Sequence, residues 1–256
     1  MGIKDNILGT FRQQDTLSPD IWVKYDNVDE FLMQEDVREQ LIEIATKFIE
    51  FMDIGADTCE IDTRDCDIID MVVTGSIANY NWSKFSDIDI HIVLDFEMIN
   101  DNREMVKKFF DAVRANWNKL HNIFVKGHEV EIYVQDMREP HFSTGVYSLE
   151  NDQWLVKPKK VKPHIDKETA TKKMKHIARE INKLSLLYDN KQYERSFELA
   201  ERLKEKIKRM RRSGLEKTGI YSPENLAFKM LRRSGDIEQL FSIYTQAYDK
   251  IYSLDQ

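Results

Sequence analysis

Residues 87–94, DIDIHIVL, alternate between polar and branched apolar side chains, and this alternation restricts how the chain can fold. Successive side chains of a β-strand point to opposite faces. The three isoleucines therefore share one face, and Asp87, Asp89 and His91 share the other. Because Asp is a poor strand former, the two aspartates mark either a solvated strand edge or a functional face.

The rest of the first half combines short strands with two longer helices. Residues 68–73 read as a buried strand, 128–135 alternate like 87–94, and 146–149 and 153–156 are candidate edge strands. Apolar residues recur at helical spacing from Asp36, a plausible N-cap, to Met52, and again over 102–121. Residues 1–35 show no sustained period. Residues 1–156 are thus predicted to form one α/β domain, a small mixed sheet flanked by helices.

The second half is predicted to be entirely helical. Residues 157–163, KPKKVKP, read as a linker because two prolines and four lysines do not suit a regular element. Residues 167–188 and 192–212 form a helical hairpin, and further helices start at Ser222-Pro223 and at Asp236. These helices constitute the predicted second domain, 164–256.

Composition and charge indicate a globular protein with two surfaces of opposite sign. The 256 residues carry a net charge of -7, with 41% hydrophobic residues and no apolar run long enough for a membrane span. The two cysteines, Cys59 and Cys66, match no zinc spacing, and with no apolar leader at the N-terminus we expect a cytoplasmic protein. Residues 157–256 have 24 basic and 14 acidic residues, a net of +10, which leaves -17 for residues 1–156.

Residues that suit phosphate chemistry surround the alternating strand. Gly75-Ser76 follows the strand over 68–73, and a glycine lets the backbone approach a phosphate closely. Asp87 and Asp89 on one strand face can converge on hard cations, because Mg²⁺ prefers oxygen ligands. Glu131 or Glu129, in the strand over 128–135, could supply a third carboxylate.

The order strand, Gly-Ser, about ten residues, Ser-Asp-x-Asp, helix, and a strand with a flanked Glu resembles the nucleotidyltransferase superfamily named after DNA polymerase beta. The matching pieces are Gly75-Ser76, Asp87-Ile88-Asp89 and Val130-Glu131-Ile132, within residues 68–135. That family has a mixed-sheet core with flanking helices, usually followed by a helical domain that helps to grip the nucleotide.

The resemblance implies roles for individual residues. Asp87 and Asp89 would bind two Mg²⁺ ions (Mn²⁺ is the alternative), and Glu131 would bind the ion that activates an acceptor hydroxyl. Gly75 and Ser76 would hold the triphosphate of an incoming NTP. The implied reaction is transfer of a nucleoside monophosphate to an acceptor hydroxyl with release of pyrophosphate.

The sequence leaves several alternatives open. Lys84 is a candidate phosphate contact or an ordinary exposed lysine. Members of the family often have a glycine where this chain has residues 79–82, NYNW, and Asn can adopt the left-handed conformation that such a turn needs. The basic residues 204–212 read as a grip on RNA or another polyanion, or as a solvated helix end.

Three functional classes remain at this stage. The first is an active nucleotidyltransferase, and the second is a catalytically silent nucleotide- or RNA-binding regulator, antitoxin-like, that retains the fold. The third is an enzyme that modifies a protein or a small molecule. The base, the acceptor and the oligomeric state are not encoded in any recognised motif.

Overall fold

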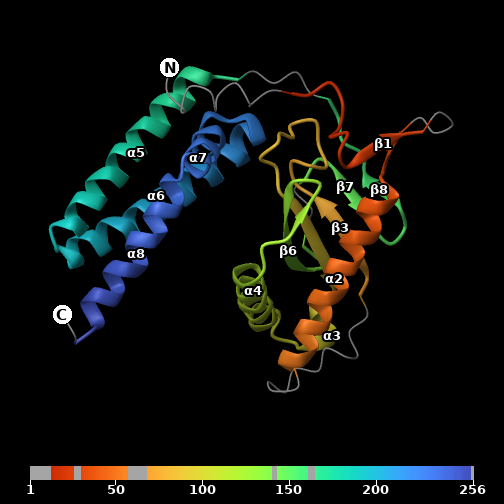
Figure 1. Cartoon of the computed structure of the whole chain (residues 1–256), viewed down its shortest axis with the longest axis horizontal. Coiled ribbons are helices and arrows are strands. Elements are labelled where there is room, and N and C mark those ends of the chain that lie inside the picture. Colours follow the sequence, from red (N-terminus) through yellow and green to blue (C-terminus); the bar gives the residue numbers. More distant parts are fainter. Residues whose placement is uncertain (1–12, 26–29, 57–67, 140–142, 161–164, 255–256) are drawn as a thin grey trace. The chain divides into compact units, whose positions relative to one another are not determined.

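The computed structural model describes residues 13–25, 30–56, 68–139, 143–160 and 165–254 (Figure 1). The chain folds as two compact units, each with a hydrophobic core of its own. The N-terminal unit lies within Arg12–Val161 and the C-terminal unit within Lys162–Gln256. Cys59, Cys66 and the last three residues of the predicted linker lie outside the described residues.

The N-terminal unit is built on a mixed six-stranded sheet in the order β5-β6-β4-β3-β7-β8. Its strands are β3 (Asp70–Thr74), β4 (Ile88–Leu94), β5 (Phe124–Val125), β6 (His128–Asp136), β7 (Val146–Ser148) and β8 (Gln153–Val156). Strands β4 and β6 are parallel, and the other neighbouring pairs are antiparallel. A parallel pair needs a long crossover, and the segment between β4 and β6 supplies it with α3 (Phe96–Ile99) and α4 (Arg103–Leu120).

Helices α2 (Glu35–Ala56) and α4 cover one face of this sheet and lie next to each other (Figure 1). The rings of Phe48 in α2 and Trp117 in α4 meet edge to face with centroids 5.5 Å apart. The three isoleucines of β4 are completely buried in the same core. The other face of β4 carries the half-buried Asp89 and His91, so the alternation read from the sequence separates a packed face from a polar face.

Two details of the N-terminal unit differ from the sequence reading. Helix α2 begins at Glu35, which places Asp36 in the first turn, not at the N-cap. The first 35 residues contain a two-stranded hairpin of β1 (Trp22–Lys24) and β2 (Phe31–Met33). These strands are three residues long, too short to show a period, and Trp22 of β1 is buried in the core.

In its described residues, the C-terminal unit consists of four longer helices and one 3₁₀ turn around its own core. They are α5 (Lys167–Asp189), α6 (Tyr193–Thr218), η1 (Gly219–Tyr221), α7 (Pro223–Arg233) and α8 (Asp236–Tyr252). Ser222 caps α7 by accepting a hydrogen bond from the amide of Asn225 at 3.2 Å. Helix α6 extends six residues beyond the predicted end and passes through Gly214, where an added Cβ would lie 2.6 Å from the Ser222 hydroxyl.

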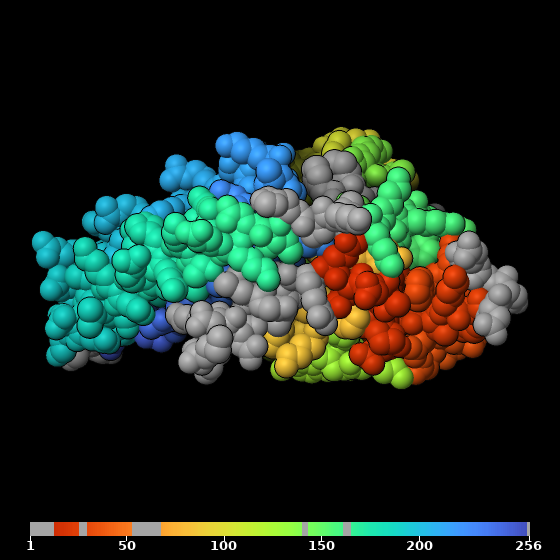
Figure 2. Space-filling view, turned by 90° about the horizontal axis from the view of Figure 1, so that it is seen from above, coloured from red at the N-terminus to blue at the C-terminus, as the bar shows by residue number. Residues whose placement is uncertain are grey.

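In the space-filling view, α5 forms part of the visible surface of the C-terminal unit (Figure 2). Among the described residues, no helix combines the length and the apolar character that crossing a membrane requires. The mixed α/β fold with a following all-helical part agrees with the fold class predicted from the sequence.

Candidate active site

The polar face of the sheet brings two predicted site carboxylates side by side. Asp89 of β4 and Glu131 of β6 are direct partners in the parallel ladder. Neighbouring strands lie about 4.8 Å apart, and residues in register project to the same face. The predicted pairing of an Asp from one strand with a Glu from another is therefore built into the sheet.

The same register separates Glu131 from the alternative, Glu129. Glu129 is the ladder partner of Phe124 in the short edge strand β5, two residues before Glu131 along β6. Because Asp89 pairs directly with Glu131, this glutamate is the one beside the aspartate. The core positions Val130 and Ile132 hold it from both sides along the strand.

Gly75 packs directly against Asp89. Its φ is +78°, in the left-handed region that favours glycine, and a Cβ built on it would lie 2.0 Å from Oδ2 of Asp89. Thr74, the residue before it, is the ladder partner of Asp89 on the other side from Glu131. The end of β3 thus delivers a turn whose backbone touches the carboxylate, and no side chain larger than hydrogen fits between them.

Side-chain hydrogen bonds, not left-handed asparagines, hold the turn after Gly75. The side-chain amide of Asn79 donates to the carbonyl of Gly75 at 2.7 Å, and its Oδ1 accepts from the hydroxyl of Thr144 at 2.7 Å. In the described part of the chain, the non-glycine residues with positive φ lie elsewhere, at Lys126, Asp152 and Lys191. Asn79 therefore ties the loop to the segment just before β7.

Ser76 is joined to the segment that carries the aspartates. Its hydroxyl donates to the hydroxyl of Ser86 at 2.8 Å, and Ser86 is buried immediately before Asp87. The carbonyl of Ser86 in turn accepts a 2.6 Å hydrogen bond from Nδ1 of the buried His128 at the start of β6. This chain of contacts fixes the Gly-Ser turn, the Asp-x-Asp segment and β6 relative to one another.

A layer of aromatic and polar side chains supports Glu131 on the same face. The hydroxyl of Tyr133 donates a hydrogen bond to Oε2 of Glu131. His91 stacks on the Tyr133 ring with centroids 5.0 Å apart and contacts Oε1 of Gln135 at 2.8 Å. The Arg114 guanidinium lies 4.8 Å from the centroid of the same ring.

The environment of Tyr133 keeps its hydroxyl protonated. Burial, followed by the hydrogen bond to Glu131 and the negative charges of Glu131 and Asp89, raises the pKa of Tyr133 far above its ordinary value. A protonated phenol can donate but cannot repel a carboxylate. Tyr133 therefore orients Glu131 through Oε2.

The remaining predicted residues are less firmly placed. Asp87 is half-buried and lies immediately before β4, which begins at Ile88, so the ladder does not fix it as it fixes Asp89. Lys84 is exposed in the connecting turn, with its ammonium 5.0 Å from the centroid of the neighbouring Phe85 ring. The structure thus brings together Gly75, Asp89 and Glu131, and it gives Lys84 no contact with them.

The carboxylates of Asp89 and Glu131 have the right chemistry to bind a hard cation, but they make up only part of the ligand set that such an ion needs. Asp89 and Glu131 offer carboxylate oxygens on adjacent strands, the ligand type that Mg²⁺ prefers. Within the described ranges, however, no three His, Cys, Asp or Glu side chains stand in a group that could hold a metal ion as they are. The pair therefore fits as a partial ligand set, and Asp87 is the residue whose side chain would have to join it.

Comparison of the chain with protein-family models, curated proteins and solved structures found no match. The assignment of a function consequently depends on the geometry of this face. The sequence reading gave no role to four residues that contribute to it: Ser86, Arg114, His128 and Tyr133. Ser86 and Tyr133 gave a signal in advance, because Ser86 begins the Ser-Asp-x-Asp motif and Tyr133 shares the outward face of its strand with Glu131.

Proposed function

We propose that the protein is a metal-dependent nucleotidyltransferase that transfers a nucleoside monophosphate from an NTP to an acceptor hydroxyl and releases pyrophosphate. One observation carries the proposal: Asp89 and Glu131 are ladder partners, and the backbone of Gly75 lies against Asp89. A carboxylate pair next to a glycine turn is an arrangement in which cations and phosphate can meet.

Asp89 and Glu131, with Asp87, would hold Mg²⁺ or Mn²⁺. Bound there, the ions would neutralise phosphate charge and lower the pKa of the attacking hydroxyl. The role of Glu131 in this scheme depends on Tyr133, whose hydrogen bond fixes one carboxylate oxygen. Asp89 is fixed by its position between Thr74 and Glu131 in the sheet.

Gly75 and Ser76 would receive the triphosphate. The missing side chain at Gly75 lets the turn approach Asp89, and the backbone amides of the turn would be the donors to phosphate oxygens. The Ser76 hydroxyl is oriented by Ser86 and could exchange that partner for a phosphate oxygen. Since phosphoryl transfer needs little from the protein beyond positioning and charge, these contacts account for the protein's part in the reaction.

A polyanionic acceptor such as RNA would suit the C-terminal unit. Residues 162–256 contain 21 basic and 14 acidic residues, a net of +7, and polyanion binding depends on such an excess. Some of the basic side chains form ion pairs within the unit: Lys206 pairs with Glu180 at 2.6 Å and Arg212 with Glu216 at 2.8 Å. Proteins and small molecules stay in the test as alternative acceptors.

The test uses each of the four NTPs, labelled at the α-phosphate, with the purified protein, Mg²⁺ and total RNA or total protein. We expect label in one acceptor class and stoichiometric pyrophosphate, both lost with EDTA and in Asp89→Asn. Lys119→Glu, an exposed substitution on α4, is the control for handling and charge.

Tight nucleotide binding without pyrophosphate release, with any acceptor, would contradict the enzymatic proposal and favour the silent regulator. Transfer of label that persists in Asp89→Asn would show that another site is responsible.

A further inference from the structure

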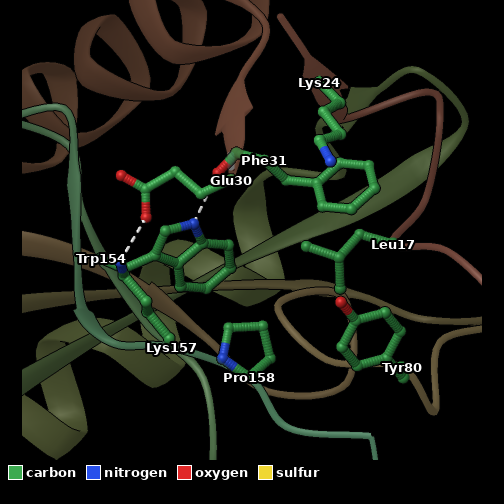
Figure 3. Close-up of a pocket in the computed structure, with 8 residues that line it drawn as sticks. All are labelled: Leu17, Lys24, Glu30, Phe31, Tyr80, Trp154, Lys157 and Pro158. Atoms are coloured by element: carbon green, nitrogen blue, oxygen red, sulfur yellow. Dashed lines mark hydrogen bonds and ion pairs between the residues drawn. The ribbon is translucent and has the colours of Figure 1, made fainter. Parts of the chain in front are cut away.

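A cavity of about 260 Å³ lies in the N-terminal unit, and Tyr80, from the loop that follows Ser76, is one of its lining residues (Figure 3). Its walls come from five separate parts of that unit, and none of the proposed metal ligands lines it. The lining residues are Leu17, Lys24, Glu30, Phe31, Tyr80, Trp154, Lys157 and Pro158. In Figure 2 the red segment that contains Leu17 lies beside the green segment that contains Trp154 and Lys157.

The apolar wall is fixed before any ligand arrives. Nε1 of Trp154 donates to the carbonyl of Phe31 at 2.6 Å, as drawn in Figure 3. The indole of Trp154 stacks on Trp22 with centroids 4.6 Å apart and an interplanar angle of 26°. Aromatic rings held in this way can accept a planar ligand without losing much side-chain entropy.

Tyr80, which belongs to the candidate phosphate loop, lines the cavity. It follows directly after Asn79, the residue that bonds to the carbonyl of Gly75. Its own carbonyl accepts a 2.7 Å hydrogen bond from the amide of Gln14. A ligand against Tyr80 would therefore touch the segment that connects Gly75 with the aspartates.

The polar groups of the cavity are mainly cationic. Lys24 and Lys157 line it, and the ammonium of Lys160 lies 5.2 Å from the centroid of the Tyr80 ring. Glu30 is the acidic group of the lining and pairs with Lys157 at 2.8 Å. Among the described residues of this region, three lysines and one glutamate carry charge, and ammonium groups are donors that a phosphate can use.

We infer that this cavity binds a nucleoside phosphate, with the base between the aromatic and apolar walls and the phosphate at the lysines. The carboxylate of Glu30 can accept a hydrogen bond from an amino or imino group of the base. The volume lies just below the roughly 300–1,000 Å³ of pockets for drug-sized ligands, so it holds one base with its sugar, not a dinucleotide. The ligand is either a free mononucleotide or one nucleotide of a single strand.

The first experiment measures binding of AMP by calorimetry in EDTA, with adenosine and single-stranded hexa-adenylate as further probes. EDTA and the Asp89→Asn variant exclude the proposed metal site, so binding here is independent of whether the proposed transferase activity exists. We expect AMP to bind Asp89→Asn and the unchanged protein alike, and adenosine to bind at least about fivefold more weakly, because it lacks the phosphate.

Two variants then place the binding in the cavity. Tyr80→Ala should weaken AMP roughly five- to 100-fold by removing a stacking surface. Lys157→Glu, at a side chain that is 67% exposed, should weaken it about three- to tenfold. Lys119→Glu is the matched control with the same charge change on α4, and it should leave AMP affinity unchanged.

Two results would overturn the inference: no binding of AMP or hexa-adenylate, or binding that neither Tyr80→Ala nor Lys157→Glu alters. If adenosine binds as tightly as AMP, the assignment of the lysines to the phosphate is also refuted. If the cavity binds these probes, a higher affinity for hexa-adenylate identifies a single strand as the ligand. A higher affinity for AMP identifies a free nucleotide.

Discussion

Replacement of Gly75 by alanine is the perturbation that the structure predicts in most detail. An alanine at φ +78° costs about 1–2 kcal/mol for the left-handed backbone alone. The new Cβ would lie 2.0 Å from Oδ2 of Asp89, so the carboxylate must move by roughly 1.4 Å to reach ordinary contact near 3.4 Å. Forcing Asp89 off its rotamer adds about 0.5–1.5 kcal/mol.

Gly127 supplies a matched control. Its φ is +80°, almost the same as at Gly75, and an added Cβ would meet nothing within 4 Å. Gly127→Ala should therefore lower the free energy of unfolding by the backbone cost alone. We expect Gly75→Ala to lower it by about 0.5–1.5 kcal/mol more.

Urea unfolding, monitored by tryptophan fluorescence, measures this difference for the N-terminal unit, which contains Gly75 and Gly127. The four tryptophans, at positions 22, 82, 117 and 154, all lie in the N-terminal unit. In an Asp89→Ala background the atoms that clash are removed, so Gly75→Ala should cost no more than Gly127→Ala. Equal costs of the two glycine substitutions in the unchanged protein, or a cost of Gly75→Ala that ignores Asp89, would refute the close contact.

Three other substitutions test separate parts of the structure. Tyr133→Phe removes the donor to Glu131 and should lower kcat of nucleotidyl transfer roughly 10- to 100-fold with little change in KM, as loss of a ligand's supporting bond usually does; an unchanged kcat would contradict the orienting role. Burial and the bond to Asp152 raise the pKa of Tyr147, so unfolding of the N-terminal unit should become easier as the pH rises above about 10, where the unfolded phenol ionises first. Tyr147→Phe should flatten this alkaline loss, and a loss of equal steepness in the variant would be the contrary result. Ser222→Ala removes the N-cap of α7 and should destabilise the C-terminal unit by about 1 kcal/mol in far-UV circular dichroism while leaving the tryptophan transition in place; a shift of the tryptophan transition instead would contradict this assignment.

The elements that the sequence predicted well have a clear period. β4 and β6 alternate along most of their seven and nine residues, and α4 runs from Arg103 to Leu120 within the predicted range 102–121. The hairpin of β1 and β2 was missed because three-residue strands carry no period. What holds it in place is the packing of Trp22 against Tyr147 and Trp154, more than a hundred positions later in the chain.

The candidate site was predictable in its residue types and not in its registers. The pairing of Asp89 with Glu131, not Glu129, follows from the parallel ladder between β4 and β6, and a sequence does not state a register. The position of Arg114 over Tyr133 depends on how α4 packs along β6. The contact of Gly75 with Asp89 needs the coordinates of two strands, although a glycine there was already a reason to expect a close approach.

The most direct test of the proposed active centre compares two conservative substitutions on one strand. Glu131→Gln and Glu129→Gln change the same group by the same amount, two residues apart on β6. In the α-labelled nucleotide assay, Glu131→Gln should reduce Mg²⁺-dependent transfer at least about a hundredfold, because a ligand carboxylate contributes several kcal/mol to the transition state. Glu129→Gln should stay within about threefold of the unchanged protein. Full activity in Glu131→Gln, or an equal loss in both variants, would contradict the assignment of Asp89 and Glu131 as the catalytic pair.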